Sequence, residues 1–244
     1  MKKIIAFTLA ETLIVMGIIG IVSALTLPNL NSSTGEKEKV AKVKKIYQNL
    51  DDAIGRAQAV YGPVNEWFLN DSTATAQITR FGDRVTEFMK VSKNCRVTTN
   101  QRCFSNTLPK PINGADGTYQ DYDTLNTTYK IQLADGTSVA FGDVGWSNIP
   151  SNVYIYFNID GPKGKNVSGN DVFGIKLNCQ TGQLELPETI HLFNLFASNN
   201  GQIVTAWVLN YGNMDYLKAS DNGKCKNSNV TLNVTANPPV TSCK

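Results

Sequence analysis

Side chains that could bind a metal ion gather in one glycine-rich stretch, residues 158–171. Asp160 and Asp171 supply carboxylates, and Asn158 and Asn166 supply amide oxygens. Such oxygens are the ligands that Ca²⁺ takes in proteins, so Asp160, Asn166 and Asp171 are candidate ligands for a structural calcium ion. The spacing differs from that of an EF-hand, and no bidentate Glu follows. A network of Asp, Asn and Gly turns, in which side chains cap backbone N–H groups, explains the same residues and is the favoured interpretation.

Five cysteines, all beyond position 90, could form disulfides if this part of the chain lies outside the cytoplasm. Cys95 and Cys103 flank a short polar loop, which is the most economical closure, and we expect them to be bridged. Spacing alone does not fix the pairing of Cys179, Cys225 and Cys243.

Residues suited to catalysis are scarce. The single histidine, His191, stands beside Leu192 and Phe193, where a structural imidazole is expected rather than a base. The sequence contains no Gly-x-Ser-x-Gly motif, no P-loop and no Cys-x-x-Cys motif. We therefore expect no enzyme, and an exported hydrolase is the weakest class of function. A net charge of +3, from 23 basic and 20 acidic residues, is too small for a nucleic-acid surface.

The one long apolar run lies at the N-terminus. Residues 7–27 are almost entirely apolar, and a helix of that length spans roughly 30 Å, the thickness of a bilayer core. Lys2 and Lys3 precede the run, which orients the N-terminus toward the cytoplasm. Glu11 lies inside it, where a carboxylate costs about 2.5–3.5 kcal/mol and usually has a partner. We expect a positive charge created elsewhere, such as a freed α-amino group on another copy of the chain.

The segment from Ala6 to Val15, Ala-Phe-Thr-Leu-Ala-Glu-Thr-Leu-Ile-Val, resembles the processing site of type IV prepilins and type II secretion pseudopilins. In that family a short basic leader is cut before an aromatic residue, and a Glu stands at the fifth position of the mature chain. A cut between Ala6 and Phe7 places Glu11 at that position and Pro28 where the family carries its helix-kinking proline. Ala6 stands where the family usually has Gly.

The resemblance implies a structural subunit of a type IV pilus or a type II secretion pseudopilus. Prepilin peptidase would remove residues 1–6 and methylate the new amine of Phe7. That amine would meet Glu11 of a neighbouring subunit, and burying this ion pair would fix the register of the helices. The implied partners are other pilin subunits, the peptidase, an inner-membrane assembly platform and the lipid bilayer. The implied location is the inner membrane, crossed once, with the head periplasmic or extracellular.

Three further features are similar to this family. Residues 158–173 resemble an Asp-Gly-rich loop of pilin-like secretion proteins, where some pseudopilins use calcium. Residues 205–208 and 212–217 resemble a recurrent C-terminal segment. Cys225 and Cys243 enclose a Thr-, Asn- and Pro-rich tail like the C-terminal disulfide loop of pilins, which implies a second bridge and leaves Cys179 as a buried small residue.

Two other interpretations of the N-terminus remain open. Val22, Ser23 and Ala24 are small residues that suit signal peptidase, so the run could be an ordinary signal sequence of a secreted or tethered adhesin-like binding domain. It could also be an uncleaved anchor. The run is longer than the usual signal-peptide core, and Glu11 would have no purpose inside it.

The rest of the long helix is expected over residues 28–61. Pro28 should kink the helix or end its first half, and residues 31–35 suggest a break followed by a new helix start. Apolar residues then recur every three or four positions, the pattern of one buried helix face, and Gly62-Pro63 ends the helix. The predicted stripe consists of Val40, Val43, Tyr47, Leu50, Ile54, Ala57 and Val60.

Residues 62–244 are expected to form a globular head. A second, shorter helix should reach Lys90. The alternation over 129–133 and 138–141, around an Asp-Gly turn, predicts a β-hairpin. Strands are also expected over 153–159, 172–177 and 182–186, and 203–209 could be strand or helix. The predicted fold is α+β and pilin-like: a long N-terminal helix, transmembrane in its first half, packs on a C-terminal antiparallel sheet.

Overall fold

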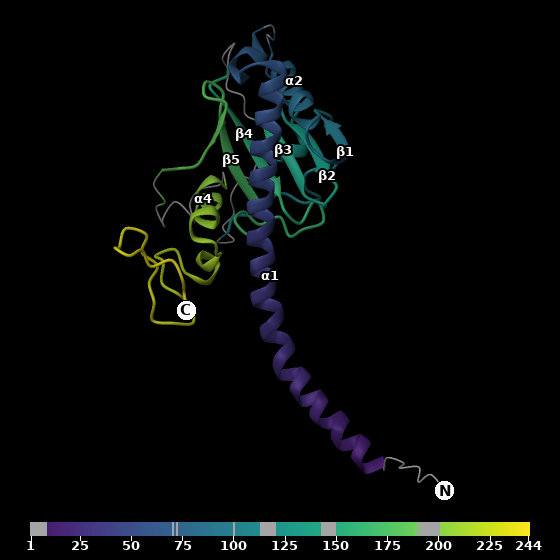
Figure 1. Ribbon diagram of the computed structural model, residues 1–244, viewed down its shortest axis with the longest axis vertical. Coiled ribbons are helices and arrows are strands. Elements are labelled where there is room, and N and C mark those ends of the chain that lie inside the picture. The colour runs from purple at the N-terminus through teal and green to yellow at the C-terminus, as the bar shows by residue number, and fades with distance from the viewer. Residues whose placement is uncertain are drawn as a thin grey trace. The chain divides into compact units, whose positions relative to one another are not determined.

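The computed structural model describes residues 9–69, 71, 73–99, 101–112, 121–142, 150–188, 190 and 201–244, with only the backbone of 23–34. It is an α+β fold with a six-stranded sheet (Figure 1). In chain order the elements are α1 (Leu9–Tyr61), η1 (Val64–Phe68), α2 (Ala74–Thr86), β1 (Val91–Arg96), η2 (Tyr122–Thr124), β2 (Tyr129–Leu133), β3 (Ser138–Gly142), β4 (Asn152–Asn158), β5 (Val172–Asn178), β6 (Gln183–Glu185), α4 (Gln202–Tyr211) and η3 (Asp215–Lys218).

The chain divides into two compact units, Met1–Glu38 and Lys39–Lys244. In the first unit the described residues are helical throughout, because α1 continues past Pro28 and through residues 31–35. The break expected at 31–35 was therefore wrong. Proline removes one backbone donor, and the polar residues and glycine that follow lower helix propensity by less than about 1 kcal/mol each. These local costs do not stop the helix.

Residues 7–27 were expected to cross a membrane, and the first two of them lie outside the described residues. Among the described residues, no helix is both long enough and apolar enough to cross a membrane.

The sheet is an antiparallel meander in which each strand pairs with the next along the chain, in the order β1-β2-β3-β4-β5-β6. The predicted hairpin is confirmed as β2 and β3, with Ile131 opposite Val139. Strands β4, β5 and β6 match the other three predicted segments. Strand β1 was missed, because its sequence, Val-Ser-Lys-Asn-Cys-Arg, is polar and mostly exposed.

The second part of α1 packs across one face of the sheet (Figure 1). Seven of its side chains are buried, and with α2 and α4 they enclose the main core: Val40, Val43, Ile46, Leu50, Ala53, Ile54 and Ala57. The predicted stripe was wrong at Val60, which is 62% exposed near the helix end. The helix ends at Tyr61 because Gly62 takes a positive φ of 79° and its N–H bonds to the Gln58 carbonyl at 3.0 Å.

Segment 203–209 proved to be helical. Glycines with positive φ flank α4 on both sides, Gly201 at 69° and Gly212 at 65°. A Cβ at Gly201 would lie 2.7 Å from the Gly174 nitrogen, so glycine lets α4 approach strand β5 closely. Thr205 Oγ accepts a hydrogen bond from that same nitrogen at 3.2 Å. The helix therefore covers the part of β5 that the short strand β6 does not reach.

A smaller aromatic cluster fills the opposite face of the sheet. Side chains alternate along β4, so Ile155 and Phe157 face the main core while Tyr156 faces the other side. Tyr156 stacks on Tyr122 with ring centroids 4.5 Å apart, and Phe104 packs edge-on against Tyr122 at 5.1 Å. Asp123 holds this layer in place, since its carboxylate accepts the backbone N–H groups of Cys103, Phe104 and Ser105.

Candidate functional site

The described start of α1 presents an unusual surface. Nine large apolar side chains are between 53% and 79% exposed: Leu9, Leu13, Ile14, Val15, Met16, Ile18, Ile19, Ile21 and Val22. They point to all sides of the helix, because they occur at adjacent positions as well as at helical spacing. A soluble helix normally buries one such stripe, and a contiguous apolar surface of this kind marks an interaction site. This part of α1 is therefore the first candidate site.

Glu11 is the only charged residue of the 9–22 segment and lies in the first turn of α1. An acid is favoured there, because the helix dipole places partial positive charge at the N-terminus. The neighbouring Thr12 hydroxyl donates to the Leu9 carbonyl at 2.9 Å. Ala6 and Phe7, the predicted processing and methylation positions, lie outside the described residues.

A second candidate site is the contact between Lys39 of α1 and the loop that precedes β5. The Lys39 ammonium lies 2.8 Å from Asp171 Oδ1, 3.0 Å from Asn170 Oδ1 and 3.2 Å from the Asn170 carbonyl. Asp160 is 3.6 Å from the same ammonium and 3.3 Å from that of Lys42. The Asp171 side chain is only 2% exposed. A lysine of the helix thus neutralises the buried carboxylate of the loop.

This arrangement bears on the three candidate calcium ligands. Asp160 and Asp171 converge on Lys39, whereas the Asn166 side chain is bound elsewhere: it accepts from Asn158 at 2.6 Å and donates to Thr107 at 2.7 Å. Among the described residues, no group of three or more His, Cys, Asp or Glu side chains is placed to hold a metal ion. The hydrogen bonds of these side chains are those of a turn network, and Asn166 itself adopts a positive φ of 57°.

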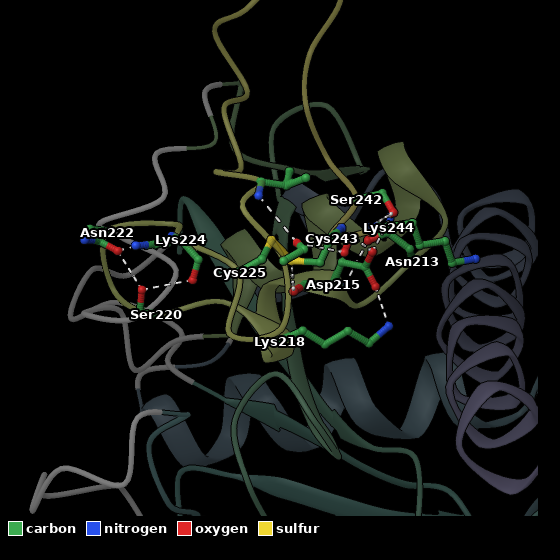
Figure 2. Close-up of a disulfide and its surroundings, with 12 residues drawn as sticks. Asn213, Asp215, Lys218, Ser220, Asn222, Lys224, Cys225, Ser242, Cys243 and Lys244 are labelled. Carbon is green, nitrogen blue, oxygen red and sulfur yellow. Dashed lines mark hydrogen bonds and ion pairs between the residues drawn. A yellow bond between two sulfur atoms is a disulfide. The ribbon is translucent and has the colours of Figure 1, made fainter. Parts of the chain in front are cut away.

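The third candidate site surrounds the C-terminal disulfide (Figure 2). Asp215, at the start of η3, is buried, and its carboxylate accepts from Lys218 Nζ, from Ser242 Oγ at 2.7 Å and from the Cys243 N–H at 2.8 Å. Burial raises the pKa of this carboxyl, but the donors outweigh burial, so its pKa lies below the usual value. Asp215 thereby ties the end of the chain to the head.

The structure pairs the cysteines as expected, Cys95 with Cys103 and Cys225 with Cys243. Cys179 is buried and unpaired at the end of β5. Burial raises the pKa of its thiol to about 12, so the reactive thiolate is essentially absent at neutral pH. Cys179 is therefore a packing residue.

Sequence reasoning missed two of the residues that organise these sites. Lys39 is one of many lysines on the polar faces of α1, and no local signal distinguishes it. Asp215 lies within the 212–217 segment, whose resemblance to a recurrent C-terminal motif was noted without a role for this carboxylate. His191 lies outside the described residues.

Comparisons with protein-family models, curated proteins and solved structures found no match to this chain.

Proposed function

We propose that this protein is a structural subunit of a helical filament, a type IV pilus or a type II secretion pseudopilus. The observation that carries the proposal is the exposed apolar surface of residues 9–22. Burying one large apolar side chain stabilises a contact by about 1.5–3 kcal/mol. Nine such side chains on one segment require a covering environment, and the proposed cover is the same segment of other copies in a filament core.

Glu11 supports the proposal that residues 9–22 pack against the same segment of other copies. A carboxylate within an apolar contact is costly unless a positive charge meets it. In the proposed filament that charge is the α-amine of Phe7 on a neighbouring subunit, freed by prepilin peptidase and then methylated. Before assembly the apolar segment would reside in the inner membrane, with the head outside the cytoplasm. The assembly platform would provide the energy, since the sequence has no nucleotide-binding motif.

The head half of α1 has a complementary role in the proposal. Its seven buried side chains and the Lys39–Asp171 ion pair hold residues 39–61 firmly in the head. When a subunit is extracted from the membrane by its helix, these contacts would keep residues 39–61 of the helix bound to the rest of the head.

Replacement of Glu11 tests the proposal directly. We expect Glu11→Gln and Glu11→Ala to abolish or strongly reduce filaments in cells that make all assembly partners, while the subunit still reaches the membrane fraction. The readouts are electron microscopy of sheared filaments and fractionation of the subunit. Glu188→Gln, at an exposed acid of the head, is the matched control and should assemble normally. Normal assembly of Glu11→Ala would contradict the filament function.

The mature N-terminus separates the proposal from its alternative. Mass spectrometry of the protein from its native membrane should find a chain that begins at N-methylated Phe7. A start at Leu25 would instead indicate signal-peptidase export and an adhesin-like binding domain. An intact Met1 would indicate a simple anchor.

A further inference from the structure

Two loops of the head, residues 106–110 and 162–166, lie side by side. The Asn106 N–H donates to the Pro162 carbonyl at 2.9 Å, and the Lys110 N–H donates to the Asn166 carbonyl at 2.6 Å. Lys110 also pairs with Val167 in a parallel bridge. These bonds hold the two loops together at both ends, and we refer to residues 106–110 and 162–166 as the lysine loop pair.

The exposed side chains of the lysine loop pair carry charge of one sign. Lys110, Lys163 and Lys165 are all exposed, and neither loop contains an acidic residue. Leu108 stands among them and is 52% exposed. The flanking acids, Asp160 and Asp171, are already neutralised by Lys39 and Lys42 of α1. The surface therefore combines three cations with one protruding apolar side chain.

The backbone of the lysine loop pair is fixed before any partner arrives. Gly161, with φ of 67°, directly precedes the second loop, and a Cβ there would lie 2.3 Å from the Gly136 carbonyl oxygen. The buried Asn166 side chain bonds to both Asn158 and Thr107, which links the two loops internally. A rigid backbone presents the lysines with little loss of conformational entropy on binding.

We propose that the lysine loop pair docks on anionic phospholipid headgroups. Lysine clusters attract the negative surface of a membrane, and an exposed leucine beside them suits the apolar–polar boundary below the headgroups. The loop pair also adjoins the residues by which α1 enters the head, because Asn170 and Asp171 bind Lys39. This inference rests on the proposed function in that it places the head beside a membrane.

Other anionic partners fit the surface less well. It contains no arginine for bidentate phosphate contacts and no aromatic side chain on which a base could stack. An acidic protein surface would not require the exposed Leu108. The membrane is the partner that uses both the charge and the apolar tip.

Vesicle binding of the full-length chain tests the inference. The probes are neutral phosphatidylcholine vesicles and vesicles that also contain phosphatidylglycerol, at low salt. The apolar start of α1 is the same in every variant and sets the baseline on neutral vesicles. Each lysine near an anionic surface contributes about fivefold in affinity. The three lysines should therefore make binding to the vesicles with phosphatidylglycerol tighter than binding to the neutral vesicles by a factor on the order of a hundred. We call this gain in affinity the anionic increment. The triple variant Lys110→Gln, Lys163→Gln, Lys165→Gln should lose this increment and keep the baseline.

The matched control removes the same charge elsewhere. Lys93→Gln, Lys224→Gln, Lys226→Gln changes three exposed lysines of the head and should keep the increment. Retention of the increment by the first variant, or equal loss in the control, would overturn the inference. So would full displacement by millimolar inorganic phosphate, which would assign the surface to the free anion. None of these results depends on filament assembly, so failure here is distinguishable from failure of the proposed function.

Discussion

At the scale of single residues, a few charged side chains connect segments far apart in the sequence. Lys39 joins the long helix to the loop before β5, and Asp215 joins η3 to the last residues of the chain. Both contacts involve a carboxylate that is almost completely buried. Removing one partner of such a pair leaves a charge without solvent and without compensation, which costs more than the pair itself contributes.

Lys39→Met should lower the free energy of unfolding by about 2–3 kcal/mol, because the buried Asp171 carboxylate loses its ammonium partner. Urea titration followed by circular dichroism measures this change. Lys44→Met, at an exposed lysine of the same helix, should change stability by less than about 0.5 kcal/mol. Equal effects of the two substitutions would show that the Lys39 contact does not stabilise the head.

Asp215 should make the stability of the head depend on pH in the acid range. Its pKa is lowered in the folded protein, so its contribution is present above the unfolded pKa of about 3.9 and is lost as the pH falls through the folded pKa. Asp215→Asn should reduce stability by about 1–2 kcal/mol at neutral pH and show a smaller loss toward pH ~2. Urea midpoints across this range test the prediction, with Asp221→Asn as the exposed control.

At the scale of elements, close approach of a neighbouring element decides where glycine is required. Gly82 of α2 lies against the ring of Tyr129 on β2, and a Cβ there would meet the Tyr129 Cγ at 2.3 Å. Gly55 of α1 has no heavy atom within 4 Å of the corresponding position. The two glycines share a helical conformation and differ only in what surrounds them.

This difference predicts opposite effects for one substitution. Gly82→Ala should destabilise the head by about 2–3 kcal/mol, because the ring of Tyr129 is buried and cannot move aside. Gly55→Ala should stabilise it by about 0.5–1 kcal/mol through helix propensity alone. Thermal unfolding of both variants is the measurement, and stabilisation by both would mean that α2 does not approach β2 as closely as described.

The elements also show which parts of the fold can be predicted from sequence. Apolar periodicity located the helix face at Val43, Leu50 and Ile54 and the alternating strands β2 to β5, because those patterns directly reflect burial. Segment 203–209 was ambiguous, since a short apolar run fits both a strand and a buried helix. The sequence of β1 shows no alternating apolar pattern, because this mostly exposed strand is held in place by its pairing with β2. Likewise the role of Lys39 depends on a loop more than 130 positions away.

At the scale of the whole molecule, two disulfides close loops of different length. Cys95 and Cys103 are 8 positions apart, and Cys225 and Cys243 are 18 apart. Loop entropy predicts that Cys225→Ser, Cys243→Ser lowers the free energy of unfolding by about 3 kcal/mol, and that Cys95→Ser, Cys103→Ser costs about 2.5 kcal/mol. Denaturant titration under oxidising conditions measures both. A negligible effect at Cys225 and Cys243 would show that Asp215 alone holds the C-terminal segment.

The two edges of the sheet limit how copies of this protein can associate. Register shifts interrupt β1 between Val91 and Lys93 and again between Asn94 and Arg96, and β6 has only three residues, while α4 covers the rest of β5. Interrupted, short or covered edges make poor templates for an added strand. Heads held at high local concentration are thereby protected against uncontrolled strand-to-strand aggregation. An ordered polymer of this chain would therefore have to use contacts other than strand pairing at these described edges.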